Sequence, residues 1–171
     1  MNTDQILTAK GNPGTLARLA AHYGRLAKRQ APGRQLQAGV FAADTELHFE
    51  FASEAKPARF HAASVGKLFT AVLVHRLVAT GQLRLDQPIA SVLDDSVTTG
   101  LFTASTESVT VQSLLEHTSG VADYFGEQIL ADPQKHWTVP ELLHFTREHF
   151  EPVAQPGAQF HYSDTGYVLL G

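Results

Sequence analysis

The sequence predicts a mixed α/β (α+β) fold, in which helices and an antiparallel β-hairpin are followed by a mainly helical domain. Three patterns support this prediction: apolar residues at helical spacing over 16–27, strict alternation over 47–51, and a long apolar helical stretch over 65–80. We place the domain boundary near residue 80. Residues 1–80 then hold a helix, the hairpin and a second helix, and residues 81–171 form the helical domain.

The first helix is marked by apolar residues that recur three and four positions apart, namely Leu16, Leu19, Ala20, Tyr23, Leu26 and Ala27. It ends before Pro32 and Gly33, because both residue types interrupt helices. Two short strands are predicted next, over 36–41 and 47–51, joined across residues 42–45. A hairpin is the simplest arrangement of two strands with so short a connection.

The second helix, over 65–80, is apolar on nearly every side, which indicates a helix in the middle of a domain. Gly81 is expected to end it. In the helical domain, Thr110 is expected to cap a short helix. Thr138 and Glu141 stand three residues apart, as in a capping box at the start of a longer helix.

The composition is that of a globular protein: 171 residues, 43% hydrophobic and 18% charged, with a net charge of −4. Basic and acidic residues are interspersed, so we expect no nucleic-acid partner. The longest apolar run, 68–74, is too short to span a membrane. The absence of cysteine excludes disulfides and thiol catalysis. No signal peptide is recognisable, which predicts a cytoplasmic protein as written, or a periplasmic or secreted one if a leader was removed.

Ser64 and Lys67 are the first candidates for chemistry. The serine lies where an extended segment meets the 65–80 helix, so its hydroxyl is expected at the positive end of the helix dipole. A spacing of three places both side chains on one face. Lys67 could take the serine proton if its pKa were lowered, and otherwise serves only as a counter-charge. The spacing alone is weak, but a lysine in so apolar a helix is costly to bury without a role.

Four segments stand in order along the chain: residues 60–71 around Ser64, Gly81-Gln82-Leu83-Arg84-Leu85-Asp86, Leu114-Leu115-Glu116-His117-Thr118-Ser119-Gly120, and Gln155-Pro156-Gly157 leading to Tyr162-Ser163-Asp164-Thr165-Gly166-Tyr167. The first resembles the nucleophile segment of the serine β-lactamase and penicillin-binding-protein superfamily, and the other three resemble later motifs of its class C and esterase branch. Four ordered matches make the resemblance specific.

The resemblance implies a β-lactamase/transpeptidase-like fold, with an antiparallel sheet flanked by helices plus a mainly helical domain. It also implies a mechanism in which Ser64 is acylated, Lys67 helps to deprotonate it, and Tyr162 relays the proton to the leaving group. Without its place in this ordered set, Tyr162 would be interpreted as a core residue. The expected activity is hydrolysis of an ester, a β-lactam or a D-amino-acid peptide through an acyl-enzyme.

Asp164 differs from the asparagine that is usual at its position in the family and is the candidate substrate-binding residue. An ionised aspartate cannot donate a hydrogen bond to a substrate carbonyl, and its charge favours the ammonium form of Lys67. Ester substrates are therefore expected before amides and β-lactams. Asp164 is also a candidate N-cap for a helix that begins at Thr165.

Other polar motifs are given no chemical role. The segment 117–120 contains a histidine and a serine, but the resemblance implies a structural turn there. His144 and His149 are five residues apart and point to different faces of a helix, and no other pair has the spacing of metal ligands. We therefore expect no metal and no cofactor.

The chain is expected to be the N-terminal part of the fold, truncated before the C-terminal strands. Residues 167–171 read as the first turns of an uncapped helix, and the family's third motif, a strand that supplies one oxyanion donor, has no counterpart. We expect a small acyl substrate as partner, and self-association or a complementary C-terminal fragment. Two alternatives stay open: a non-catalytic ligand-binding or interaction module of this fold, and one half of a two-chain enzyme.

Overall fold

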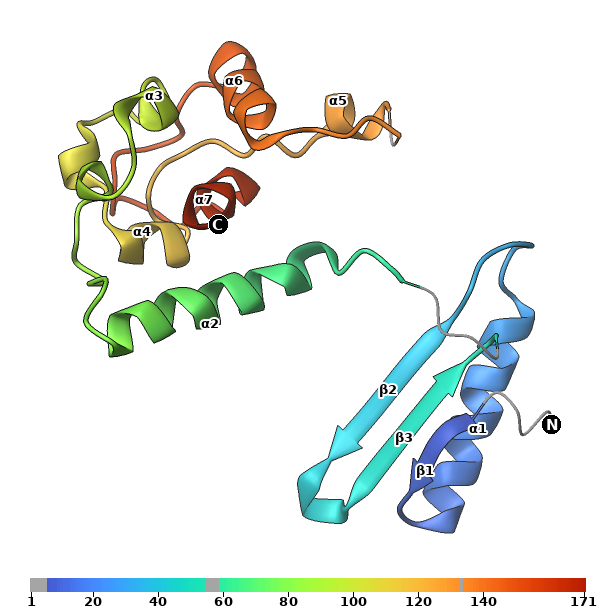
Figure 1. Cartoon of the computed structure of the whole chain (residues 1–171). Helices are drawn as coiled ribbons and strands as arrows, with labels where there is room; N and C mark the ends of the chain where they lie inside the picture. Colours follow the sequence, from blue (N-terminus) through green and yellow to red (C-terminus); the bar gives the residue numbers. More distant parts are fainter. Residues whose placement is uncertain (1–5, 55–58, 133) are drawn as a thin grey trace. The chain divides into compact units, whose positions relative to one another are not determined.

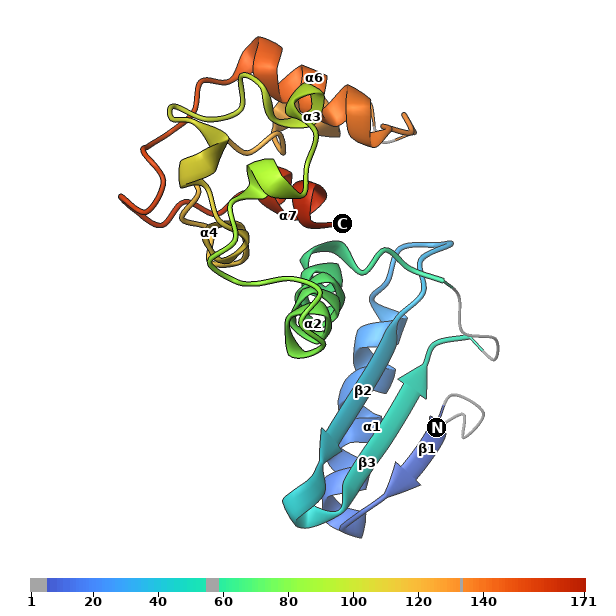
Figure 2. The same ribbon diagram turned by 60° about the vertical axis from the view of Figure 1, so that its left-hand side comes forward.

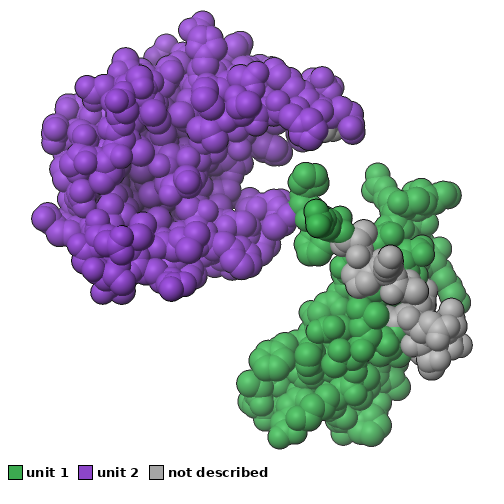
Figure 3. Space-filling model, viewed as in Figure 1, with its two compact units in different colours: residues 1–61 green, residues 62–171 purple. Residues whose placement is uncertain are grey.

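The computed structural model describes residues 6–54, 59–132 and 134–171. The chain forms two compact units, residues 1–61 and residues 62–171 (Figure 3). The domain boundary expected near residue 80 concerns the domains of the larger fold and stays a prediction. Over the described ranges, none of the helices has both the length and the apolar character needed to cross a bilayer.

The first unit combines one helix with a three-stranded antiparallel sheet of order β1-β3-β2. Its elements in chain order are β1 (Ile6–Lys10), α1 (Pro13–Lys28), β2 (Gln37–Ala42), a 3-10 turn (Ala43–Thr45) and β3 (Leu47–Ala52). The predicted helix and hairpin are confirmed. Strand β1, which was not predicted, adds to the other edge of β3.

Alternation in the strands explains how the sheet packs. In β3, Phe49 and Phe51 are buried, and Tyr23 of α1 places its ring 6.0 Å from each of theirs. The helix lies along this face of the sheet (Figure 1). Asn12 caps α1, since its side-chain oxygen accepts from the backbone N–H of Gly14 at 2.9 Å. The apolar face of α1 and the inward-facing residues of β3, both predicted from their spacing in the sequence, thus pack into one small core.

The second unit is helical and is built around α7 (Asp164–Leu170), which packs against α2, α4 and α6 (Figures 1 and 2). The other helices are α2 (Gly66–Ala79), α3 (Asp95–Thr98), α4 (Val111–Leu115), α5 (Glu127–Leu130) and α6 (Val139–His149), with 3-10 turns at Ala63–Val65, Ile89–Ser91 and Thr106–Ser108. Aliphatic residues from these helices and the loops between them form the core: Ile89, Leu101, Val109, Leu114, Val121, Leu143 and Leu169.

Two helix starts in this unit have the predicted caps. Thr110 caps α4 in a capping box with Ser113. Thr138 caps α6 in a capping box with Glu141, whose carboxylate accepts from the Thr138 N–H at 2.8 Å. Each box satisfies backbone donors that a helix start leaves without partners, so the chain direction is fixed at both points.

Helix α6 carries two further contacts that hold it in the unit. The Arg147 guanidinium donates to the carbonyls of Ser96 at 2.9 Å and Val97 at 2.6 Å, which ties α6 to the α3 segment. Just before α6, the Trp137 ring lies 5.3 Å from the Phe145 ring and 3.3 Å from Lys135 Nζ. A cation over the face of an indole is a favourable arrangement.

The expectation that α2 lies in the middle of a domain is wrong for the structure described. Only Val74 of this helix is buried. At about 100° per residue, the opposite side of α2 carries its large exposed apolar side chains: Leu68, Phe69, Val72, Leu73 and Leu77. An apolar helix needs cover on every side, and within its own unit α2 is covered on one side only.

Candidate active site

All four predicted site residues lie in the second unit. Ser64 belongs to the 3-10 turn Ala63–Val65, immediately before α2 begins at Gly66. Its side chain is exposed. Ala63 has φ +47°, in the left-handed region that costs a non-glycine residue about 1–2 kcal/mol. The serine is therefore presented from a strained turn at the positive end of a 14-residue helix.

Lys67 lies one turn into α2 and forms an ion pair with Asp164 at the start of α7. The two side chains are only 17% and 18% exposed, so the pair is largely shielded from water. Lys67 Nζ also lies 4.9 Å from the ring centroid of Tyr162 and 5.6 Å from that of Tyr167. The ammonium is thus held between one carboxylate and two aromatic rings.

The pKa of Lys67 is raised above its ordinary value of 10.5. Burial acts to lower it, but hydrogen bonds to Asp164 and Tyr162 and the negative charge of Asp164 outweigh that effect. The ammonium form is therefore the stable one throughout the neutral range.

Tyr162 reaches the serine from the segment that precedes α7. Its hydroxyl donates to Ser64 Oγ at 2.8 Å, although the two residues are 98 positions apart in the sequence. Ser64, Lys67, Tyr162 and Asp164 thus form one continuous set of contacts. Their catalytic roles stay predictions.

The start of α7 differs from the expectation. Ser163 is the N-cap, since its hydroxyl oxygen accepts from the Gly166 N–H at 3.3 Å, and Asp164 is already inside the helix. The expectation that Asp164 caps this helix is wrong, because its carboxylate is paired with Lys67 instead. The Ser163 hydroxyl also donates to the Ala122 carbonyl at 3.0 Å, which anchors the helix start in the unit.

One carboxylate close to the site was not predicted. Asp123 Oδ1 accepts from the backbone N–H of Asp164 at 3.0 Å and from that of Phe125 at 3.1 Å. Burial raises the pKa of Asp123, although both hydrogen bonds act to lower it. Asp123 was missed because it stands in no recognisable motif. Only the structure shows that the loop after α4 brings it next to the start of α7.

The segment 117–120 fixes the chain that leads to Tyr162. The carbonyl of His117 accepts from the His161 N–H at 2.8 Å, that of Thr118 from the Gly157 N–H at 2.7 Å, and that of Gly120 from the Val153 N–H at 2.9 Å. A Cβ on Gly120 would overlap the Ala154 carbonyl oxygen. The expected structural turn therefore holds residues 153–161 in place through backbone hydrogen bonds.

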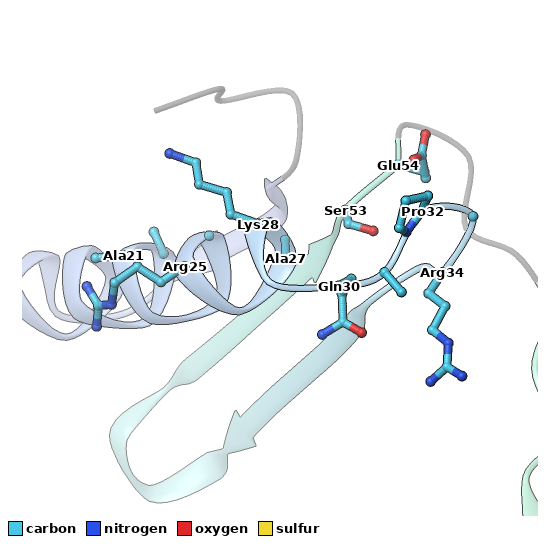
Figure 4. Close-up of a pocket in the computed structure, with 13 residues that line it drawn as sticks. Ala21, Arg25, Ala27, Lys28, Gln30, Pro32, Arg34, Ser53 and Glu54 are labelled. Carbon is cyan, nitrogen blue, oxygen red and sulfur yellow. The ribbon is translucent and has the colours of Figure 1, made fainter.

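A pocket of about 750 Å³ lies in the first unit and contains none of these residues. It is lined by α1, the turn after it and the two residues that follow β3, Ser53 and Glu54 (Figure 4). The side chains of Arg25, Lys28 and Arg34 extend from it in different directions (Figure 4). Cations that do not converge on one point are a poor anion site, so we assign the pocket no chemistry.

Comparison with known proteins identifies the family. Residues 56–171 match the family model described as Beta-lactamase. The chain belongs to the beta-lactamase family. Penicillin-binding protein 4 of Amycolatopsis lactamdurans is 46% identical over 118 residues, a match that covers 66% of this chain and 28% of that protein. The predicted membership of the serine β-lactamase and penicillin-binding-protein superfamily is confirmed.

Similar solved structures confirm the predicted fold class. The D-amino acid amidase of Ochrobactrum anthropi SV3 superposes with a TM-score of 0.66 and 25% identity, over 91% of this chain and 42% of that one. The D-stereospecific amidohydrolase of a Streptomyces species gives a TM-score of 0.59 and 31% identity, over 72% and 39%. This beta-lactamase family chain therefore spans less than half the length of these relatives.

Proposed function

We propose that this chain carries the nucleophile part of a serine hydrolase that works through an acyl-enzyme on Ser64. The observation that supports it most directly is the 2.8 Å hydrogen bond from the Tyr162 hydroxyl to Ser64 Oγ, with the Lys67 ammonium beside the tyrosine ring. Family membership supports the same reaction class. So do relatives whose names describe an amidase and an amidohydrolase.

In the proposed acylation, Ser64 Oγ forms a bond to the acyl carbon as the bond from that carbon to the leaving group breaks. The serine proton passes to the Tyr162 oxygen, and Tyr162 gives its own proton to the leaving group. In deacylation, a water oxygen bonds to the acyl carbon as the bond from that carbon to Ser64 Oγ breaks. The proton of the water passes to the Tyr162 oxygen, Tyr162 gives its own proton to Ser64 Oγ, and the free acid leaves. No external reagent is needed.

The proposed role of Lys67 is that of a counter-charge. Its raised pKa and its ion pair with Asp164 keep it an ammonium, which cannot accept the serine proton. A fixed cation beside Tyr162 instead stabilises the negative charge that develops on the phenol oxygen during transfer. Of the two roles considered for Lys67, the charge distribution favours this one over that of a base.

The proposed substrates are small acyl compounds: esters, β-lactams, or amides and peptides of D-amino acids, the last group following from the names of the structural relatives. Asp164 in its ionised form accepts hydrogen bonds but donates none, so it provides no amide donor for a substrate carbonyl. We therefore place esters first. An ester also has a better leaving group, which places less demand on the proton relay.

A second candidate is one half of a two-chain enzyme, and the exposed apolar side of α2 favours it. Five large apolar side chains on a single helix form a surface of the kind that a partner chain or a second copy would cover. A binding module without catalysis is the remaining alternative. It shares the fold but predicts an unreactive Ser64.

The test is the intact mass of the chain after incubation with a fluorophosphonate and, separately, with a penicillin. We expect one phosphonate adduct in the wild type and none in Ser64→Ala. An adduct that persists in Ser64→Ala lies elsewhere and rules out the assignment. A wild-type chain that stays unmodified by both reagents, while folded by circular dichroism, supports the binding module instead.

A further inference from the structure

His117 forms hydrogen bonds with the residues before and after Tyr162. Its carbonyl accepts from the N–H of His161, the residue before the tyrosine, at 2.8 Å. Its Nδ1 accepts from the N–H of Ser163, the residue after the tyrosine, at 3.1 Å. His117 has φ +58°, a left-handed conformation that lets one residue direct both its carbonyl and its ring at the same segment.

The imidazole also contacts the tyrosine ring directly. The ring centroids of His117 and Tyr162 are 4.5 Å apart, with an angle of 30° between the planes. Behind it, the Tyr167 ring lies 5.1 Å from His117, and the Tyr167 hydroxyl donates to the Leu115 carbonyl at 3.1 Å. Tyr162 itself is 40% exposed, and His117 contacts it through this ring and through the hydrogen bonds to the residues on either side of it.

We propose that His117, in its neutral form, is the positioning residue that holds Tyr162 against Ser64. The proposal rests on the proposed function, because it concerns the same tyrosine. His117 touches no reacting atom and acts through the backbone and ring of Tyr162. A displacement of about 1 Å in a reacting group lowers rates by about 100-fold, so such a residue has a measurable effect.

The hydrogen bond from Ser163 requires a neutral imidazole with its proton on Nε2. Protonation of Nδ1 replaces an acceptor by a donor that faces another donor, which breaks the bond. The titratable groups around the ring are Lys67 on α2, Asp164 and Tyr167 on α7, and Asp123, His161 and Tyr162 on the adjoining loops. Burial, and then the charge of Lys67, lower the pKa of His117 below its usual 6.5, although Asp164 and Asp123 act against this shift.

The experiment compares the rate of Ser64 phosphonylation against pH in the wild type, His117→Asn and His117→Leu. The Asn carbonyl takes the place of Nδ1 as acceptor, does not titrate, and tolerates a positive φ. We expect His117→Asn to keep the neutral-pH rate within about threefold and to lose the acidic fall in rate, and His117→Leu to be about 10- to 100-fold slower. Equal rates in all three proteins would overturn the proposal.

A double variant separates positioning from general destabilisation. If His117 acts through Tyr162, then His117→Leu has no further effect once Tyr162 is replaced by Phe. We therefore expect Tyr162→Phe/His117→Leu to react as slowly as Tyr162→Phe alone. A double variant that is slower by the product of the two single effects would show that His117 acts elsewhere.

A readout without activity keeps this inference separate from the proposed function. In an NMR titration of the wild-type chain, the Ser163 amide and the Tyr162 ring signals are expected to shift with the pKa of His117. If Ser64 stays unlabelled while these signals follow His117, the proposed reaction fails and the positioning of Tyr162 stands. If the two signals do not follow His117, the positioning role is overturned whatever the labelling result.

Discussion

Lys67 shows how a single charged residue links the stability of this fold to its chemistry. Its ammonium is shielded from water and paired with Asp164, and its pKa is raised relative to the unfolded chain. A group of this kind stabilises the folded state fully below its unfolded pKa, near 10.5. That contribution is lost as the pH rises through the folded value.

We expect Lys67→Met to lower the free energy of unfolding at pH 7 by about 1–3 kcal/mol, because Asp164 loses its cation in a shielded place. The difference in free energy of unfolding between Lys67→Met and the wild type should disappear once the pH exceeds the pKa of Lys67 in the folded state. Denaturant titrations at pH 7 and at a series of alkaline pH values measure it. Lys10→Met is the control, since its ion pair with Glu46 is exposed and is worth less than about 1 kcal/mol. A gap that persists at high pH would contradict the assignment.

Replacing Asp164 by Asn is expected to change substrate preference. The amide restores a donor for a substrate carbonyl and removes the carboxylate that stabilises the Lys67 ammonium. The ratio of ester to amide turnover should fall by about tenfold, the effect of one hydrogen bond to a buried partner. Matched ester and amide derivatives of one D-amino acid provide the measurement. Asp123→Asn, which keeps an acceptor for the Asp164 N–H, should leave the ratio unchanged.

At the residue scale, position in a motif decided which residues could be predicted from the sequence. Ser64, Lys67 and Tyr162 were predicted because they stand in an ordered pattern, and the structure brings them together. Asp123 and the contacts of His117 were not predicted. Both depend on contacts between a loop and the start of a helix about 40 residues later in the sequence. Such contacts leave no periodic pattern in the sequence.

At the scale of elements, the segment 117–120 does more than turn the chain. Its carbonyls bind three separate points of residues 153–161, so the path to Tyr162 is set before α7 begins. Gly120 is the tightest point, with φ +79° and the Ala154 carbonyl where a side chain would start. Only glycine meets both conditions.

We therefore expect Gly120→Ala to destabilise the second unit by more than about 3 kcal/mol, since strain and overlap add. Gly157→Ala is the matched control, because Gly157 has the same φ of +79° and open space around it. It should cost only about 1–2 kcal/mol, the left-handed strain alone. Thermal unfolding of both variants measures the difference. Equal losses would mean that the overlap is relieved by movement of residue 154.

Prediction of elements worked where the signal is local. The caps at Thr110 and Thr138 and the hairpin need only a few neighbouring residues, and all are confirmed. Strand β1 was missed because it has only five residues, and Thr8 and Lys10 at alternate positions make its pattern too polar to indicate a strand. The cap of α7 was assigned to Asp164 instead of Ser163, since the competing pair with Lys67 comes from a residue 97 positions away.

At the scale of the whole molecule, the exposed side of α2 is the feature from which we predict behaviour in solution. Leu68, Phe69, Val72 and Leu73 are each between 57% and 69% exposed and lie on one side of the helix. The pattern correctly showed a helix without a polar face. It could not show which neighbour covers each side, because cover is a property of the assembled fold.

We expect the chain to self-associate at micromolar concentration through this side of α2. Leu68→Lys combined with Leu73→Lys should shift sedimentation towards the monomer, because two charges oppose burial of the surface. Leu130→Lys is the control, since Leu130 is 59% exposed but lies on the short helix α5. A wild-type chain that sediments as a monomer across the same concentrations would contradict the expectation.

The fluorescence of Trp137 distinguishes the unfolding of the second unit from that of the first. It is the only tryptophan of the sequence and packs against Phe145 in the second unit, whereas Tyr23, in the core of the first, is that unit's only tyrosine. Excitation at the red edge, which tyrosine does not absorb, follows the helical unit alone, while circular dichroism follows both. Whether the units melt together or in sequence is thus readable from the native chain without a label.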